Sequence, residues 1–251
     1  PTSTELRIIG VPGMPEVAPG DDLVALIAAA VARAAIAVTA GDVLVVAHKI
    51  VSKAEGRLVR LAEVEPSALA ERWGAQTGRD PRLVELALRE STRIVRMDRG
   101  VLIAETRHGF ICANAGVDGS NVGDGFAALL PEDPDASAGR LCAGLTRAFG
   151  VETAVIVSDT FGRAWREGQV NVALGVAGLR PLIDYRGGAD TFGRRLQATV
   201  IAIADELASA AELVMRKTAG VPVAIVRGAR YEAGSGAARA LIRPPSQDLF
   251  R

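Results

Sequence analysis

Short apolar runs rich in Val and Ile alternate with longer segments of helical periodicity in the first and last parts of the chain. Apolar runs of this length, bounded by polar or turn residues, predict strands that are buried on both faces. Such strands are expected at Leu6–Ile9, Val43–Ala47, Ala154–Val157 and Val221–Val226. Helices are expected over Leu23–Ala37, from Asp133 to about Phe149, and over Leu196–Lys217. Alternating strands and helices are typical of an α/β fold.

The middle of the chain has a different pattern. Two segments with an early proline, Pro66–Thr77 and Pro81–Glu90, predict helices. Three short strands are expected after them, with turn residues between, at Arg93–Met97, Val101–Glu105 and Gly109–Asn114. This order predicts an antiparallel meander and gives the middle an α+β character. We therefore expect one unit over residues 1–251, with a smaller second lobe around residues 60–115. Residues 169–184 give no clear assignment.

Composition and charge argue against two classes of partner. The chain has 251 residues, 49% of them hydrophobic, and its 29 Lys and Arg balance its 29 Asp and Glu. Proteins that bind nucleic acid or anionic membranes generally carry a basic excess, so neither partner is expected. Charged residues interrupt both long apolar stretches, around Ala25–Val38 and Ala198–Val214, so no membrane span is expected.

The cysteines and the start of the chain bear on the compartment. Cys112 and Cys142 are the only cysteines, and they form no CxxC pair. Without a disulfide framework or a signal peptide at the start, the sequence predicts a reduced, cytoplasmic protein.

Oxygen ligands follow the predicted strand Ala154–Val157, which is expected to end where polar residues begin. Asp159 and Thr160 would lie just past the carboxyl end of this strand, where ligands collect in sheets flanked by helices. A carboxylate and a hydroxyl suit Mg²⁺ or Mn²⁺. Arg163 and Arg166 follow, and guanidinium groups match phosphate or carboxylate. The alternative is that Asp159 or Thr160 caps a turn and that both arginines are solvated.

Two glycine-rich segments are candidate ligand loops. The first covers residues 10–20. The second, residues 115–126, adds oxygen atoms from Asp118 and Asn121 to four glycines, which let a backbone approach a ligand closely. An irregular connection explains both compositions equally well.

Basic residues after the strand Val43–Ala47 leave the type of site open. Lys53 is a candidate phosphate contact, although an exposed lysine is more often only solubilising. His48 has no second histidine one helical turn away, so a zinc site has no support. No Gly-Lys dipeptide occurs, which excludes a P-loop, and no GxGxxG follows a predicted strand. Phosphates would therefore have to bind through a metal, lysine and irregular loops.

Four segments carry a family resemblance. They are, in chain order, 51–57 (VSKAEGR), 115–121 (AGVDGSN), 158–166 (SDTFGRAWR) and 204–215 (ADELASAAELVM). With these segments the chain resembles the coenzyme F420-0:γ-glutamyl ligases over nearly its whole length.

The resemblance implies an activity, a fold and partners. Such enzymes use GTP and a divalent metal, Mg²⁺ or Mn²⁺, to join L-glutamate to the lactyl carboxyl group of coenzyme F420-0, and then add further γ-linked glutamates. K⁺ is an optional further cation. The expected fold is an α/β arrangement peculiar to the family, seen as an intertwined homodimer. A flavin-binding, nitroreductase-like domain is fused to some relatives, and this chain stops close to where the ligase domain should end.

The resemblance also implies roles for individual residues. Asp118, Asp159 and Thr160 correspond to metal ligands. GTP contacts are expected from the loop Met14, Pro15, Glu16 and Val17, and from His48, Lys53, Asn121 and Lys217.

Three positions depart from the family pattern. His48 stands where relatives tend to have a small polar residue, and Arg216 stands where many have glycine. Lys217 can touch phosphate, but as a cation it would not ligate a metal, so fewer metal ligands are expected than in a relative with glutamine there.

The expected mechanism is formation of an acyl phosphate from GTP, followed by attack of the glutamate amine. Asp118, Asp159, Lys53, Arg163 and Arg166 are the candidate catalytic residues. Two alternatives stay open: a nucleotide-dependent amide ligase for another acidic acceptor, and a non-catalytic relative that binds a nucleotide or deazaflavin.

Overall fold

The central sheet of the protein combines antiparallel edges with one parallel pair. The structure, a computed structural model, describes residues 5–248. The sheet has the strand order β1-β12-β2-β8-β9, in which only β2 and β8 run parallel. Its strands are β1 (Arg7–Gly10), β2 (Val43–Ala47), β8 (Ala154–Arg163), β9 (Arg166–Ala177) and β12 (Val223–Arg227).

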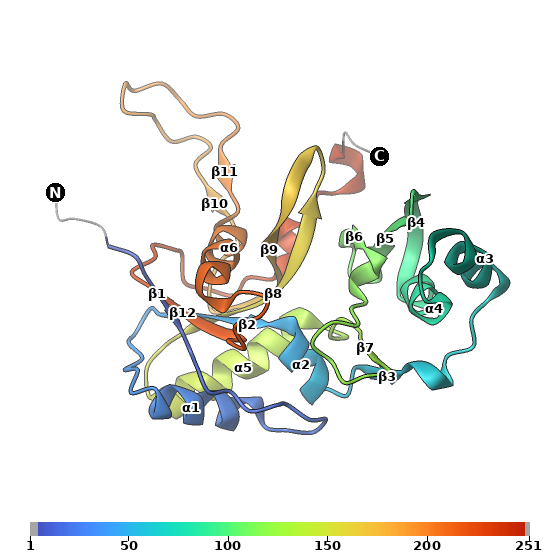
Figure 1. Ribbon diagram of the computed structural model, residues 1–251. Helices are drawn as coiled ribbons and strands as arrows, with labels where there is room; N and C mark the ends of the chain where they lie inside the picture. Colours follow the sequence, from blue (N-terminus) through green and yellow to red (C-terminus); the bar gives the residue numbers. More distant parts are fainter. Residues whose placement is uncertain (1–4, 249–251) are drawn as a thin grey trace.

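Helices cover both faces of this sheet, as Figure 1 shows. Helices α1 (Leu23–Arg33) and α5 (Pro134–Phe149) pack on one face, and α6 (Ile203–Met215) packs on the other. Alternate residues of β2 accordingly enter different cores: Leu44 faces α1 and α5, whereas Val45 faces α6. Burial on both faces explains the uninterrupted apolar runs in the sequence. The expected mixed α/β architecture is confirmed.

The middle of the chain forms separate, smaller sheets (Figure 1). Strands β4 (Ser91–Asp98), β5 (Val101–Thr106) and β6 (Ile111–Ala113) make the expected antiparallel meander. They lie beside helices α3 (Ala68–Thr77) and α4 (Pro81–Arg89). Strands β3 (Leu58–Arg60) and β7 (Phe126–Ala128) pair with each other. The chain enters this region through β3 and leaves it through β7. Its status as a second lobe stays a prediction.

Several element boundaries differ from those expected. Helix α1 ends at Arg33 rather than Ala37, because the chain turns at Ala35 with a φ of 51°. Helix α6 begins only at Ile203, because residues 196–202 belong to a projecting arm. A short helix, α2 (His48–Ala54), directly follows β2. Residues 169–177, left unassigned above, are part of the long strand β9.

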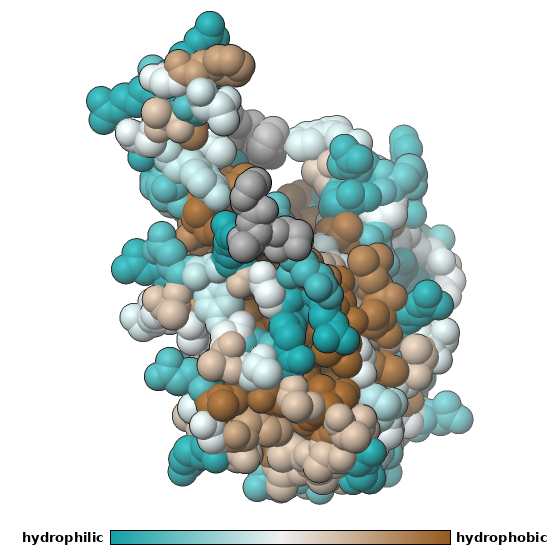
Figure 2. Space-filling model, turned by 90° about the vertical axis from the view of Figure 1, so that its left-hand side faces the viewer, coloured by the Kyte–Doolittle hydropathy of each residue, from teal (hydrophilic) through white to brown (hydrophobic). Residues whose placement is uncertain are grey.

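The projecting arm is built on the strand pair β10 (Ile183–Asp184) and β11 (Val200–Ile201). It rises above α6 in Figure 1 and extends from the upper left of the molecule in Figure 2, with mainly hydrophilic colours. Phe192 on this arm is 88% exposed. Within residues 5–248, no helix is long and apolar enough to cross a membrane.

One glycine sets the distance between α5 and the sheet. A Cβ at Gly175 in β9 would lie 2.0 Å from the carbonyl oxygen of Pro134, at the start of α5. Next to it, the Val176 amide donates to Asp135 Oδ1 at 2.9 Å. The start of α5 can therefore reach β9 only because no side chain stands between them.

We expect Gly175→Ala to lower the free energy of unfolding by about 3 kcal/mol, since the added methyl group meets backbone that cannot move aside. Gly139→Ala is the matched control, because a Cβ there meets no atom within 4 Å and the site is helical. This control should gain up to about 1 kcal/mol. Denaturant unfolding of both variants measures the difference, and equal stabilities would contradict the close approach.

Candidate functional site

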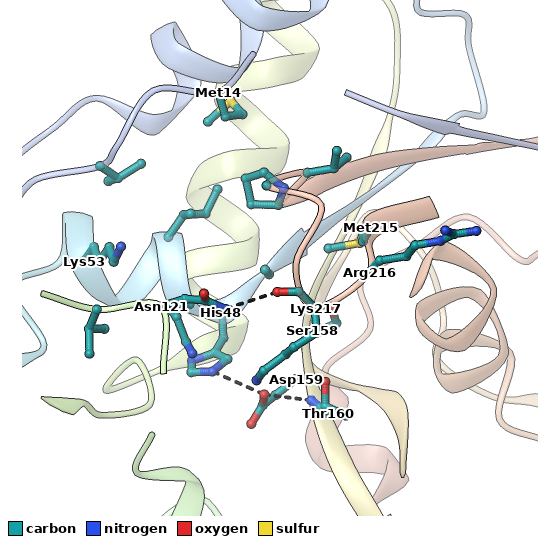
Figure 3. A pocket seen from close by; sticks show the side chains of 18 of the residues that line it. Met14, His48, Lys53, Asn121, Ser158, Asp159, Thr160, Met215, Arg216 and Lys217 are labelled. Atoms are coloured by element: carbon teal, nitrogen blue, oxygen red, sulfur yellow. Dashed lines mark hydrogen bonds and ion pairs between the residues drawn. The ribbon is translucent and has the colours of Figure 1, made fainter. Parts of the chain in front are cut away.

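The sheet topology brings four chain segments to one edge. Strand β2 ends there, and β8 runs past it. The chain leaves β1 for the loop 11–20 at the same edge and enters the antiparallel strand β12 there. A pocket of about 700 Å³ opens where these segments meet (Figure 3). It is lined by residues 14–17, 47–50, 53, 121–123, 158–160, 171, 212, 215–218 and 220–222.

The sequence predicted that the strand beginning at Ala154 ends at Val157, but β8 continues to Arg163. Ser158 pairs with Ala47, the last residue of β2, and β8 then continues to Arg163 with β9 as its only partner among the described strands. Asp159 and Thr160 therefore lie within a strand, just beyond the end of β2. Polar residues are accommodated here because the pocket replaces the next strand.

His48 and Asp159 form the centre of the site. The His48 ring points at Asp159 (Figure 3), with Nε2 3.3 Å from the carboxylate Oδ1 and with Nδ1 3.3 Å from Ser52 Oγ. Burial alone would raise the pKa of Asp159, but His48 and the Thr160 amide outweigh it, so that this pKa lies below its usual value. The carboxylate is thus held ionised at neutral pH.

Lys53 is buried, contrary to the solvated alternative. Its side chain is 7% exposed, and its ammonium group pairs with Glu16, whose side chain is 83% exposed. Glu16 belongs to the loop 14–17, which also lines the pocket. An incoming anion could take the place of Glu16, because the glutamate can turn into solvent while the lysine stays.

Asp118 is not among the residues that line the pocket, but two of the pocket lysines contact its carboxylate. Lys49 Nζ donates to Asp118 Oδ2 at 2.7 Å, and Lys217 Nζ lies 3.4 Å from the same oxygen. Burial raises the pKa of Asp118, but hydrogen bonds from Lys49 and from Ser120 hold it well below its usual range. The Asp118 charge raises the pKa of Asp159, as the smallest of the effects on that carboxyl group.

All the lysines of the protein are here. The chain has three, Lys49, Lys53 and Lys217, and each of them lines the pocket, whereas every other basic side chain apart from the two histidines is an arginine. Lysine presents a compact point charge on a flexible stem, which suits phosphate contacts that must form and break. This distribution was not noticed in the sequence, although it could have been counted there.

Hydrogen bonds link Thr160 to two further side chains, neither of which the sequence pointed to as a site residue. The Thr160 hydroxyl donates to Asn171 Oδ1 at 2.8 Å, and Asn171 Nδ2 donates to Glu212 Oε2 at 3.1 Å. Glu212 lies within the family segment 204–215, which gave it no role of its own, and Asn171 lies within residues 169–184, which gave no clear assignment. Only the pairing of β9 with β8 places Asn171 opposite Thr160.

The remaining candidates divide into two groups. Asn121 reaches the pocket and donates to the carbonyl oxygen of Lys217 at 3.3 Å. Arg163 and Arg166 lie at the exposed tip of the β8–β9 hairpin, outside the pocket, and Arg163 donates to the carbonyl oxygen of Glu167.

Arg216 adopts a backbone conformation that disfavours a side chain. Its φ of 49° and ψ of 148° belong to a region that is almost confined to glycine. Its side chain points away from His48 and Asp159 in Figure 3. The backbone, not the guanidinium group, therefore faces the centre of the site.

The donors present fit a divalent metal. Asp159 is ionised. The Thr160 hydroxyl donates a hydrogen bond to Asn171, so the lone pairs of the hydroxyl oxygen stay available to a metal ion. Asp118 already holds ammonium groups where another cation could bind. Ser158 Oγ, buried beside them, has no hydrogen-bond partner within residues 5–248. No cluster of three His, Cys, Asp or Glu side chains occurs in this part of the chain, so hydroxyl or phosphate oxygens would have to complete the coordination.

The fold and the pocket thus define a mixed α/β protein with a lysine-lined pocket at one edge of its central sheet. A family model described as F420-0:Gamma-glutamyl ligase matches residues 13–228. The chain belongs to this family.

Relatives over the full length agree with this assignment. The coenzyme F420:L-glutamate ligase of Methanothermobacter thermautotrophicus is 49% identical, with 98% of this chain and 99% of the relative covered. The protein of the same name from Methanopyrus kandleri is also 49% identical, with 98% of each chain covered. That of Methanocaldococcus jannaschii is 43% identical over 84% of this chain and 85% of its own. The family resemblance read from the motifs is confirmed.

Cys112 offers a test of the electrostatics around the site. Burial and the nearby Asp159 charge raise the pKa of this thiol to about 12. Because the reactive thiolate forms only as the pH approaches the pKa, we expect no alkylation of Cys112 by iodoacetamide at pH 8 in the folded protein. Peptide mass mapping measures this, with the unfolded chain as the control that must react. Rapid labelling of the folded protein would contradict the burial beside Asp159.

Proposed function

We propose that this chain is a GTP- and divalent-metal-dependent ligase that joins L-glutamate to the lactyl carboxyl group of coenzyme F420-0 and then adds γ-linked glutamates. The observation that carries the proposal is that three lysines line the same pocket as Asp159 and Thr160, in a chain of this family. The names of the relatives supply the acceptor and the amino acid.

Ligation of this kind needs an activated carboxyl group. A carboxylate oxygen attacks the γ-phosphorus of GTP and GDP leaves, which gives an acyl phosphate. The glutamate amine then attacks the acyl carbon, inorganic phosphate leaves, and the amine loses its proton. The protein's task is to position three anionic substrates and to offset their charge.

The pocket residues divide this task. Lys53 exchanges Glu16 for a phosphate oxygen, and the loop 14–17, which lines the pocket, lies beside the bound nucleotide. Lys217 and Asn121 hold the nucleotide from the other side. His48 holds the Asp159 carboxylate in place, and its contact with the nucleotide stays a proposal.

A divalent ion would be held by Asp159, by the Thr160 hydroxyl and by Asp118. Bound there, the ion would supply positive charge that offsets the charge of the γ-phosphate. Lys49 and Lys217 would then turn from Asp118 toward the phosphates. Mg²⁺, Mn²⁺ and an additional K⁺ all stay proposals.

Incubation of the protein with F420-0, L-glutamate and either GTP or ATP, with and without Mg²⁺ or Mn²⁺, tests the function by mass spectrometry. Products heavier by successive glutamyl units, formed with GTP and metal only, would support it. Turnover of another acidic acceptor would favour a different amide ligase, and no phosphate release with all substrates present would favour a non-catalytic binder.

Asp159→Asn keeps the shape of the side chain but removes its charge. We expect metal-dependent turnover to fall by several orders of magnitude, because the metal offsets the charge of the transition state. Asp184→Asn, on the exposed arm, is the control and should retain activity. Near wild-type turnover of Asp159→Asn, with unchanged melting temperature, would remove Asp159 from the metal site.

Lys53→Ala should weaken GTP binding about 10- to 100-fold, because a charge-assisted contact to phosphate is lost. Glu16→Gln should instead strengthen binding, since Lys53 no longer has to leave an ion pair. Calorimetric titration of GTP measures both variants, with Arg72→Ala on the exposed face of α3 as the control. A purely structural Lys53 would leave the Glu16→Gln affinity unchanged.

Other expectations from the family stay proposals. Arg163 and Arg166 lie outside the pocket, so a role in binding the acceptor would require the hairpin tip to approach it. The pocket geometry bears on none of the other three expectations, which stay proposals: the homodimer, the cytoplasmic location and a partner flavin-binding domain.

A further inference from the structure

One carboxylate in the pocket has no basic side chain as its partner. Three acidic side chains line the pocket: Glu16, Asp159 and Glu212. Glu16 pairs with Lys53, and Asp159 pairs with His48. Glu212 makes no ion pair within residues 5–248, and the amide of Asn171 is its only side-chain partner there.

Glu212 is nevertheless held in one orientation. Its Oε2 accepts a hydrogen bond of 3.1 Å from Asn171 Nδ2, and the Asn171 side chain is itself fixed by the Thr160 hydroxyl at 2.8 Å. Asn171 is buried, and the Ser209 hydroxyl donates to its backbone oxygen at 2.7 Å. The second carboxylate oxygen, Oε1, accepts no hydrogen bond from the described residues. Glu212 is thus a positioned anion with one oxygen to spare.

A positioned anion in a lysine-lined pocket would repel most of the proposed substrates. GTP, the acceptor carboxylate and the side chain of glutamate are all anionic. The α-ammonium group of the incoming amino acid is the one cation among them. An unpaired carboxylate costs free energy when partly buried, so it is expected where a cationic ligand completes it.

We propose that Glu212 binds the α-ammonium group of the amino acid that is to be ligated. This inference rests on the proposed function, and it adds a residue that selects the amine substrate. The two hydrogen bonds of the Asn171 side chain fix Glu212 relative to Thr160. In the proposed function, the γ-phosphate that activates the acceptor carboxyl group binds beside Thr160. The nitrogen is thereby held next to the acyl carbon, and it attacks once the ammonium group has given one proton to the Glu212 carboxylate or to water.

Glu212→Gln tests this role, because glutamine still accepts the hydrogen bond from Asn171 and changes only the charge. The KM for L-glutamate should rise about 10- to 100-fold, as expected for loss of a charge-assisted contact, with the melting temperature unchanged. Glu206→Gln, an exposed acid on the same helix, is the matched control. An unchanged KM for glutamate would overturn the proposal and leave Glu212 as a partner of Asn171 only.

A neutral amine separates ammonium binding from phosphate chemistry. Hydroxylamine is uncharged at neutral pH and attacks an acyl phosphate to give a hydroxamate and inorganic phosphate. With F420-0 and GTP, Glu212→Gln should form hydroxamate within about twofold of the wild-type rate, because this amine does not need a carboxylate partner. An equal loss of hydroxamate and glutamate ligation would assign Glu212 to metal or phosphate and overturn the proposal.

The wild-type protein distinguishes the two levels of inference. If it forms no hydroxamate with GTP, the proposed ligase function fails, and the role of Glu212 fails with it. If it does, inhibition by 2-hydroxyglutarate, which lacks the amine, provides an independent check. The wild type should bind this analogue less tightly than glutamate, and Glu212→Gln should lose that preference. Should Glu212→Gln be unstable, Glu212→Asp must show the same selective rise in the KM for glutamate; no rise would overturn the proposal.

Discussion

The parallel pairing of β2 with β8 is the constraint on which the site depends. Ala47 stands beside Ser158 in this pair, and both strands run toward the same edge. Because β12 runs antiparallel to β2, its first residues are brought to that edge as well. Residues more than a hundred positions apart in the sequence are thereby brought close together by main-chain hydrogen bonds alone. The pocket is a product of sheet topology before any side chain is considered.

The side chains then distribute charge in pairs. Lys53 with Glu16, His48 with Asp159, and Lys49 with Asp118 each join an acid on one segment to a base on another. In the described structure these pairs neutralise groups that would otherwise repel or be poorly solvated. In the proposed function, a phosphate or a metal ion would replace one partner of each pair. Glu212 differs because its partner is a neutral amide.

The sequence predicted the central strands because both of their faces are buried, which produces apolar runs without alternation. It was wrong about the end of β8, because polarity after Val157 was interpreted as a break rather than as a strand that borders a pocket. The predicted helix Leu23–Ala37 continued too far at its end, and the predicted helix Leu196–Lys217 began too early. Alanine-rich and apolar sequence contains no local signal for either boundary. The turn at Ala35 and the arm before α6 depend on tertiary contacts. Likewise, Asn171 reaches Thr160, and Glu212 reaches Asn171, only because β8 and β9 pair in this register, which no local sequence pattern encodes.

The confinement of lysine to a single place has a practical consequence. Arginine supplies the positive charge of the remaining surface, so a primary-amine side chain occurs nowhere but at the pocket. A protein grown with isotope-labelled lysine would carry three spectroscopic probes, and each would report on the chemistry of the site without any engineered substitution.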